Sequence, residues 1–133
     1  YAEDADALVK EAVPALLRAM AYSNPSGKQN TFAGNVLPSA VLVECKEYPI
    51  PVSYANAFIK PVKATREADL VQRSIEELQK MIKDTVQDFP MLADAKRIWF
   101  KAGEKKDFAA MPSVKTAVNY DELVQDVSAI LSK

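Results

Sequence analysis

Apolar and polar residues in the first part of the chain recur with the period of an α-helix, and alanines fill many of the remaining positions. The apolar positions of this pattern are Leu8, Val9, Val13, Leu16, Leu17 and Met20. Pro14 interrupts the pattern, which predicts a kink or two shorter helices. The turn-forming residues 23–27 predict the end of this helical region.

Residues 39–46 alternate with period two, which predicts a half-buried β-strand. One face carries Val41, Val43 and Cys45, and the other carries Leu42, Glu44 and Lys46. We expect the first of these faces to lie against the core, with its cysteine as a small core residue and not a nucleophile. Pro49 and Pro51 prevent regular pairing, so residues 47–63 are expected to be extended or looped.

The remainder of the chain predicts a second helix, a short strand and a terminal helix. The second helix is expected over residues 66–88, with Thr65 as its N-cap. Its inner stripe consists of Leu70, Val71, Ile75, Leu78, Met81 and Ile82. Residues 97–101 have the aromatic and β-branched composition of a strand. Asn119 followed by Glu122 resembles a capping box and predicts the start of the final helix.

The predicted order of helix, strand, helix, strand and helix indicates an α+β fold. A length of 133 residues corresponds to a single domain, 1–133. Two strands alone make a poor sheet, and the chain opens at Tyr1 without a methionine. We therefore expect this domain to be one part of a longer protein.

The composition is that of an ordinary globular protein, with 49% hydrophobic and 26% charged residues. No apolar run approaches the roughly 18 residues that cross a bilayer, and no signal peptide opens the chain. The single cysteine excludes an internal disulfide, and the lack of histidine removes the commonest general base and metal ligand. We expect a cytoplasmic protein with no membrane contact, no metal and no cofactor.

The formal net charge is −1, but charge is distributed unevenly along the chain. Residues 24–66 carry five cations against two anions, a net of +3, and the segment on either side carries a net of −2. The five cations are Lys28, Lys46, Lys60, Lys63 and Arg66. A basic stripe on a nearly neutral body can bind a polyanion, although a chance cluster of solvated lysines would look the same.

The most unusual segment is the polar loop at residues 25–31, Pro-Ser-Gly-Lys-Gln-Asn-Thr, between the first helix and the first strand. Lys28 offers a cation, Gln29 and Asn30 offer amide groups, and the glycine lets another backbone approach closely. These groups suit phosphate and sugar better than bond-breaking chemistry. The phosphate loop of nucleotide hydrolases is not indicated, because that motif needs glycine in place of Tyr22 and serine or threonine in place of Gln29.

No catalytic arrangement stands out elsewhere in the sequence. The carboxylates of the second helix are explained by a solvated helix face, and no serine has the context of a nucleophile. Trp99 and Phe100 could stack on bases, but packing in the core is the better interpretation. The pattern leaves the roles of Tyr54 and Phe58 undecided, because small residues surround them in an irregular segment.

Two motifs in the basic half of the chain resemble the CasC family of CRISPR proteins. The first is Pro-Ser-Gly-Lys-Gln-Asn-Thr-Phe-Ala at residues 25–33, with Leu-Pro at 37–38 and Val-Leu-Val-Glu at 41–44. The second is Pro-Val-Ser-Tyr-Ala-Asn-Ala-Phe at residues 51–58, followed by Lys-Pro-Val at 60–62. The resemblance is dense over residues 8–63 and only topological over residues 64–133. Family members form the crRNA-binding backbone of Cascade, the type I-E CRISPR surveillance complex.

This resemblance implies that the chain is similar to the carboxy-terminal part of a larger protein shaped like a right hand. It would supply the second half of an RRM-like or ferredoxin-like palm, without the amino-terminal half, the fingers or the thumb. The family's subunits are not nucleases. They assemble head to tail along the guide RNA, hold its backbone without sequence specificity and present its bases to target DNA. The implied partners are guide RNA (crRNA), target DNA through the guide, further copies of the subunit and other Cascade subunits.

The RNA contact is expected at the polar loop and at two lysines further along the basic segment. These residues are Asn24, Ser26, Gly27, Lys28, Gln29, Asn30, Thr31, Lys60 and Lys63. Cations and amide donors of this kind suit binding to phosphates without base readout. Two other functions stay open: a small enzyme that uses Lys28 or Asn30 on a phosphate-bearing substrate, and a protein-interaction domain with no nucleic-acid role.

Overall fold

A computed structural model describes residues 2–23, 37–103 and 114–132 of the chain. Its elements are α1 (Ala2–Tyr22), β1 (Ala40–Cys45), the 3₁₀ helix η1 (Ala55–Phe58), α2 (Leu70–Asp88), the 3₁₀ helix η2 (Pro90–Asp94), β2 (Lys96–Lys101), β3 (Val114–Thr116) and α3 (Tyr120–Leu131). The predicted α+β class is confirmed, and the short strand β3 and the two 3₁₀ helices are additional to the predicted elements. None of the helices described here is long and apolar enough to cross a bilayer.

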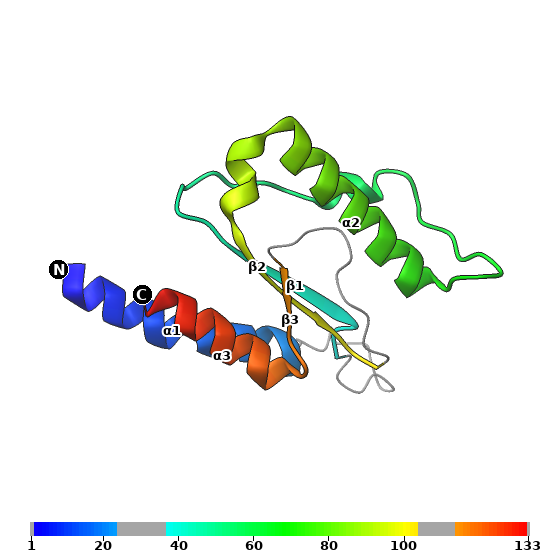
Figure 1. Ribbon diagram of the computed structural model, residues 1–133. Coiled ribbons are helices and arrows are strands. Elements are labelled where there is room, and N and C mark those ends of the chain that lie inside the picture. Colours follow the sequence, from blue (N-terminus) through cyan, green and yellow to red (C-terminus); the bar gives the residue numbers. More distant parts are fainter. Residues whose placement is uncertain (1, 24–36, 104–113, 133) are drawn as a thin grey trace.

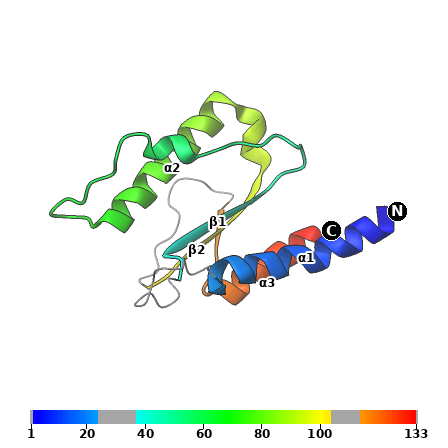
Figure 2. The same ribbon diagram turned by 180° about the vertical axis from the view of Figure 1, so that it is seen from behind.

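One mixed sheet lies between two helical layers (Figure 1). Its strand order is β1-β2-β3, with β1 antiparallel and β3 parallel to β2. Helices α1 and α3 pack together on one face, and α2 covers the other, as both views show (Figures 1 and 2). β3 has only three residues, too few for a periodic pattern, and this is why the sequence does not predict it.

The larger core cluster lies between the sheet and the helices α1 and α3. Its buried residues are Ala21, Ile98, Phe100, Ala117, Tyr120, Leu123, Val124 and Val127. Val41, Val43 and Cys45 pack against this cluster, which confirms the face of β1 that was expected to lie against the core. Burial raises the pKa of the Cys45 thiol, as expected for a core cysteine that is not a nucleophile.

The second face of β1 is covered too, so the expectation of a half-buried strand is wrong. Ile75, Ile82 and Trp99 form a buried cluster on this side, and Leu42 packs against it. All six residues of β1 are therefore partly buried. The core role expected for Trp99 and Phe100 is confirmed, with exposed fractions of 1% and 9%.

Helix α2 begins at Leu70, four residues later than the sequence predicts. Asp69 is its N-cap and accepts a hydrogen bond from Gln72 N at 2.8 Å. Thr65 Oγ1 instead accepts a backbone amide three residues further on, at 3.1 Å, in the turn before the helix. Leu70 and Val71 are 54% and 40% exposed, so the inner stripe does not include the first turn.

The other helix boundaries follow local rules more closely. Pro14 lies inside α1, which is one helix and not two shorter ones. Asn119 caps α3 as predicted and accepts from Glu122 N at 2.8 Å. The Glu122 carboxylate accepts from Val118 N at 3.2 Å, one residue before the cap. Residues 47–63 form no strand, as expected, and contain only the single turn η1.

Candidate nucleic-acid interface

The loop that the sequence indicates as the RNA contact lies outside the described residues. This applies to Asn24, Ser26, Gly27, Lys28, Gln29, Asn30 and Thr31, whose role stays a prediction. The two elements that flank the loop are described. α1 ends at Tyr22, where Ser23 N donates to Ala19 O at 2.9 Å, and the chain resumes at Leu37 and enters β1. The loop therefore connects the carboxyl end of α1 to the amino end of β1.

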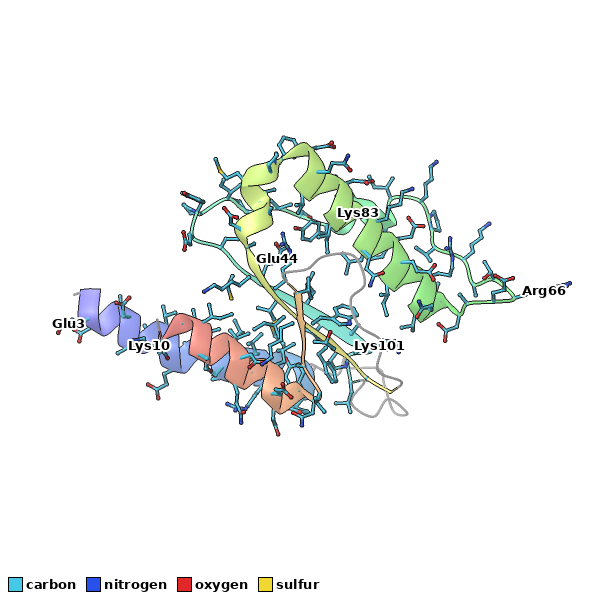
Figure 3. The ribbon with its side chains drawn as sticks, viewed as in Figure 1. Glu3, Lys10, Glu44, Arg66, Lys83 and Lys101 are labelled. Atoms are coloured by element: carbon cyan, nitrogen blue, oxygen red, sulfur yellow. The ribbon has the colours of Figure 1, made fainter. Side chains whose placement is uncertain are left out.

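Another cation stands at this end of the sheet. Lys101, the last residue of β2, pairs with Ala40, the first residue of β1, and Ala102 N donates to Ser39 O at 2.9 Å. Gly103 then has a φ of +75°, which favours glycine, as the chain leaves the strand. Figure 3 shows Lys101 at this end of the sheet. In the sequence Lys101 is only a strand residue, because the pairing that places it beside the start of β1 is visible only in the fold.

Lys60 and Lys63 lie on a different part of the surface, between η1 and α2. Both are exposed and line an open groove of about 760 Å³ between residues 56–65 and α2. Neither forms an ion pair within the described part of the chain. Arg73 in the same groove is held by two glutamates of α2, at 2.9 and 3.7 Å. The two lysines therefore belong, with Lys80 of α2, to the cations of this groove that have no ion pair among the described residues.

The groove as a whole carries both signs of charge. Its wall on α2 contains Lys80 and Arg73 together with Glu77, Asp84 and Asp88. These carboxylates would repel a phosphate backbone that lay along the helix. The rim formed by residues 60–63 is therefore the part of the groove that carries cations without carboxylates. Arg66 is the cation that follows Lys63 in the sequence, and Figure 3 shows it projecting from the tip of the segment before α2.

A buried ion pair holds β1 and β2 together on the side of the sheet that α2 covers. Arg97 is 1% exposed and lies opposite Glu44 in the strand register. Its guanidinium is 3.3 Å from Glu44 Oε2 and donates to Leu92 O at 2.9 Å. Lys46 Nζ is 3.9 Å from the same carboxylate oxygen.

The side chains of the described segments include no group of three His, Cys, Asp or Glu that could hold a metal ion.

Tyr54 packs against the buried cluster below α2, so its role is packing. Burial, and secondarily the neighbouring Glu44, raises the pKa of Tyr54 to about 12. The Tyr54 hydroxyl is close to Glu44 and Arg97 but forms no hydrogen bond of good geometry with either. Phe58 is 45% exposed, so it does not share this core position.

We expect Tyr54 to make the fold less stable at alkaline pH. Its pKa is about 12 in the folded chain, against 10.0 for a free tyrosine. Its contribution is therefore fully present below about pH 10 and is lost as the pH rises toward about 12. In urea unfolding between about pH 9 and about pH 11, Tyr54→Phe should show a shallower loss of stability than the wild type. Tyr48→Phe, at a position 56% exposed, is the control and should keep the wild-type slope. Equal slopes for Tyr54→Phe and the wild type would contradict this account.

Comparison with known proteins identifies related chains. A family model described as CT1975-like protein matches residues 2–126. No curated protein sequence matches the chain. A chain of a solved structure named "CRISPR RNA-guided surveillance complex" is 29% identical with a TM-score of 0.75, and the match covers 91% of this chain and 44% of that one. A chain named "CRISPR RNA-guided surveillance complex, pre-nicking" is 27% identical with a TM-score of 0.78. This match covers 95% of the present chain and 36% of the solved one.

These matches agree with the resemblance to the CasC family that the two sequence motifs carry. They extend it over α2, β2, β3 and most of α3, where the sequence alone shows only a similar order of elements. The chain spans less than half the length of each of these two solved chains.

Proposed function

This chain belongs to the CT1975-like protein family, and we propose that it forms part of a crRNA-binding backbone subunit of a type I CRISPR surveillance complex. The structural similarity carries this proposal. Two chains named as belonging to CRISPR RNA-guided surveillance complexes match 91% and 95% of this chain, with TM-scores of 0.75 and 0.78. Identities of 29% and 27% add sequence similarity to the common fold. The role proposed is structural and non-catalytic.

In this proposal the loop 24–31 is the main contact with the guide RNA. Lys28 neutralises a phosphate, while Gln29 and Asn30 donate hydrogen bonds to phosphate or 2′-hydroxyl oxygens. None of these contacts reads the edge of a base, so the grip is independent of sequence. Lys60 and Lys63, which have no ion pair among the described residues, support a second point of contact along the rim of their groove.

The proposal also includes the assembly around the guide. Further copies of the subunit follow one another head to tail along the RNA, in contact with other Cascade subunits, and the guide bases pair with target DNA. Because the chain covers 44% and 36% of the two solved chains, these contacts belong to the whole subunit and are best tested in a complex that contains it.

Lys28→Ala, in a complete subunit that contains this chain, should weaken binding of single-stranded RNA to a similar degree for unrelated sequences. Loss of one phosphate contact lowers the slope of log affinity against log salt concentration by about 0.7 for a single strand. The measurement is the affinity for two unrelated RNA sequences across a salt series, by fluorescence anisotropy.

The matched control is Lys10→Ala, which removes an exposed lysine from α1 and should leave the slope unchanged. An unchanged slope in Lys28→Ala would remove this lysine from the phosphate contacts. A loss of affinity confined to one of the two RNA sequences would indicate base readout and would argue against the proposed function.

A further inference from the structure

The segment between β1 and η1 is held at both of its ends, on the side of the sheet that α2 covers. At the start, Lys46 Nζ donates to Ile50 O at 3.2 Å and lies 3.9 Å from Glu44 Oε2 in β1. At the other end, the side chain of Tyr54 packs against the buried cluster beneath α2. From there the chain runs alongside α2, as both views show (Figures 1 and 2).

The lysine rim, residues 60–63, follows Tyr54 after one short turn. Tyr54 O accepts a hydrogen bond from Ala57 N at 3.0 Å, and the turn η1 packs against α2. Asn56 O accepts from Ile59 N at 3.3 Å, and the rim begins at the next residue. Among the described residues, Tyr54 is the last one before the rim whose side chain packs against a core cluster. The turn therefore connects the rim to the core through Tyr54.

The position of the rim matters because the opposite wall of its groove is partly acidic. Glu77, Asp84 and Asp88 of α2 line this wall. A loose rim would let Lys60 and Lys63 approach these carboxylates, and the resulting ion pairs would compete with phosphate groups. In the structure neither lysine forms an ion pair with a described residue. The rim is therefore held apart from the acidic wall.

We propose that Tyr54 is a positioning residue for RNA binding, whose packed ring holds η1 so that Lys60 and Lys63 face phosphate groups before RNA arrives. A rim that is already ordered loses less conformational entropy when it binds. The ring carries this role, because the Tyr54 hydroxyl forms no hydrogen bond of good geometry. The inference rests on the proposed function, since it concerns how the second point of contact with the guide RNA is held.

The test measures the affinity for single-stranded RNA of a complete subunit that contains this chain, by fluorescence anisotropy. Tyr54→Ala should weaken binding at least about threefold. In the background Lys60→Ala, Lys63→Ala, the same substitution should change the affinity less than about twofold, because the side chains that it positions are gone. Tyr54→Phe keeps the ring and should bind RNA like the wild type. The control Val124→Ala opens the buried cluster on the other face of the sheet, and should leave the affinity unchanged.

A second variant decides the question if Tyr54→Ala does not fold. Two glycines inserted between Ile59 and Lys60 leave the core intact and uncouple the rim from the ring. This insertion should also weaken RNA binding at least about threefold, and the loss should again disappear when Lys60 and Lys63 are alanine.

Three results would overturn the proposal. The first is an equal loss of affinity on Tyr54→Ala with and without the two lysines, because Tyr54 would then act on the fold in general. The second is wild-type affinity of the glycine insertion. The third is unchanged affinity of Lys60→Ala, Lys63→Ala by itself, because the rim would then not be an RNA contact. The proposed function is tested separately, by the salt slope of Lys28→Ala, in which Tyr54 and the rim are intact.

Discussion

Replacing Arg97 by alanine is expected to destabilise the folded chain by about 3–5 kcal/mol. Arg97 is 1% exposed, donates to Leu92 O at 2.9 Å and to Ala95 O at 3.4 Å, and pairs with Glu44. The substitution removes these contacts and leaves the Glu44 side chain, only 12% exposed, with Lys46 as its remaining cation. The measurement is urea unfolding followed by the fluorescence of the single tryptophan of the chain.

Two control variants separate burial from charge. Arg73→Ala breaks ion pairs whose side chains are more than a third exposed, and should cost less than about 1 kcal/mol. The double variant Arg97→Met with Glu44→Leu removes both buried charges and should cost clearly less than Arg97→Ala alone. A loss of less than about 1 kcal/mol in Arg97→Ala would contradict the structural role of the buried pair.

The sequence predicts the long helices well, because their signals are local. The apolar residues of α1 and α3 repeat with the helical period, and the cap at Asn119 depends on an amide three residues away. At the start of α2 the same rule is ambiguous, since Thr65 and Asp69 can both cap a helix. Only the tertiary fold, which leaves Leu70 exposed and buries Ile75, decides between them.

Features that depend on distant pairing cannot be predicted in this way. β3 is a strand only because it pairs with β2, and its three residues carry no pattern of their own. A charged residue such as Arg97 is expected at the surface, because isolated charges are rarely buried. Its burial depends on Glu44, which belongs to a strand far away in the sequence. The sequence also does not predict that α2 covers the second face of β1, because this contact too joins residues that are far apart in the sequence.

The candidate site is predictable only in part. The loop 24–31 stands out because small and polar residues interrupt two apolar patterns. The sequence also indicates Lys60 and Lys63 as exposed cations, but it does not show that they share a groove with the carboxylates of α2. Lys101 is not indicated at all, since only the pairing of β1 with β2 brings it beside the strand that the loop enters.

The largest functional effect is expected from removing all three proposed phosphate contacts together. The triple variant Lys28→Ala, Lys60→Ala, Lys63→Ala should lower the salt slope of single-stranded RNA binding by about 2, at 0.7 per contact. Affinity should fall most at low salt, where release of counterions contributes most. The matched control replaces three other exposed lysines by alanine: Lys10, Lys83 and Lys96.

The most direct test of the proposed function is this salt slope, measured for the complete subunit with two unrelated RNA sequences. Tryptophan fluorescence should first show that both triple variants are folded, because Trp99 is buried and reports on the core. Of the substituted lysines, only Lys96 of the control variant lies close to Trp99 in the sequence. A slope lowered by about 2 for both RNA sequences, with the control close to the wild type, is the result that a sequence-independent grip predicts. An unchanged slope, or an equal fall in the control, would contradict it.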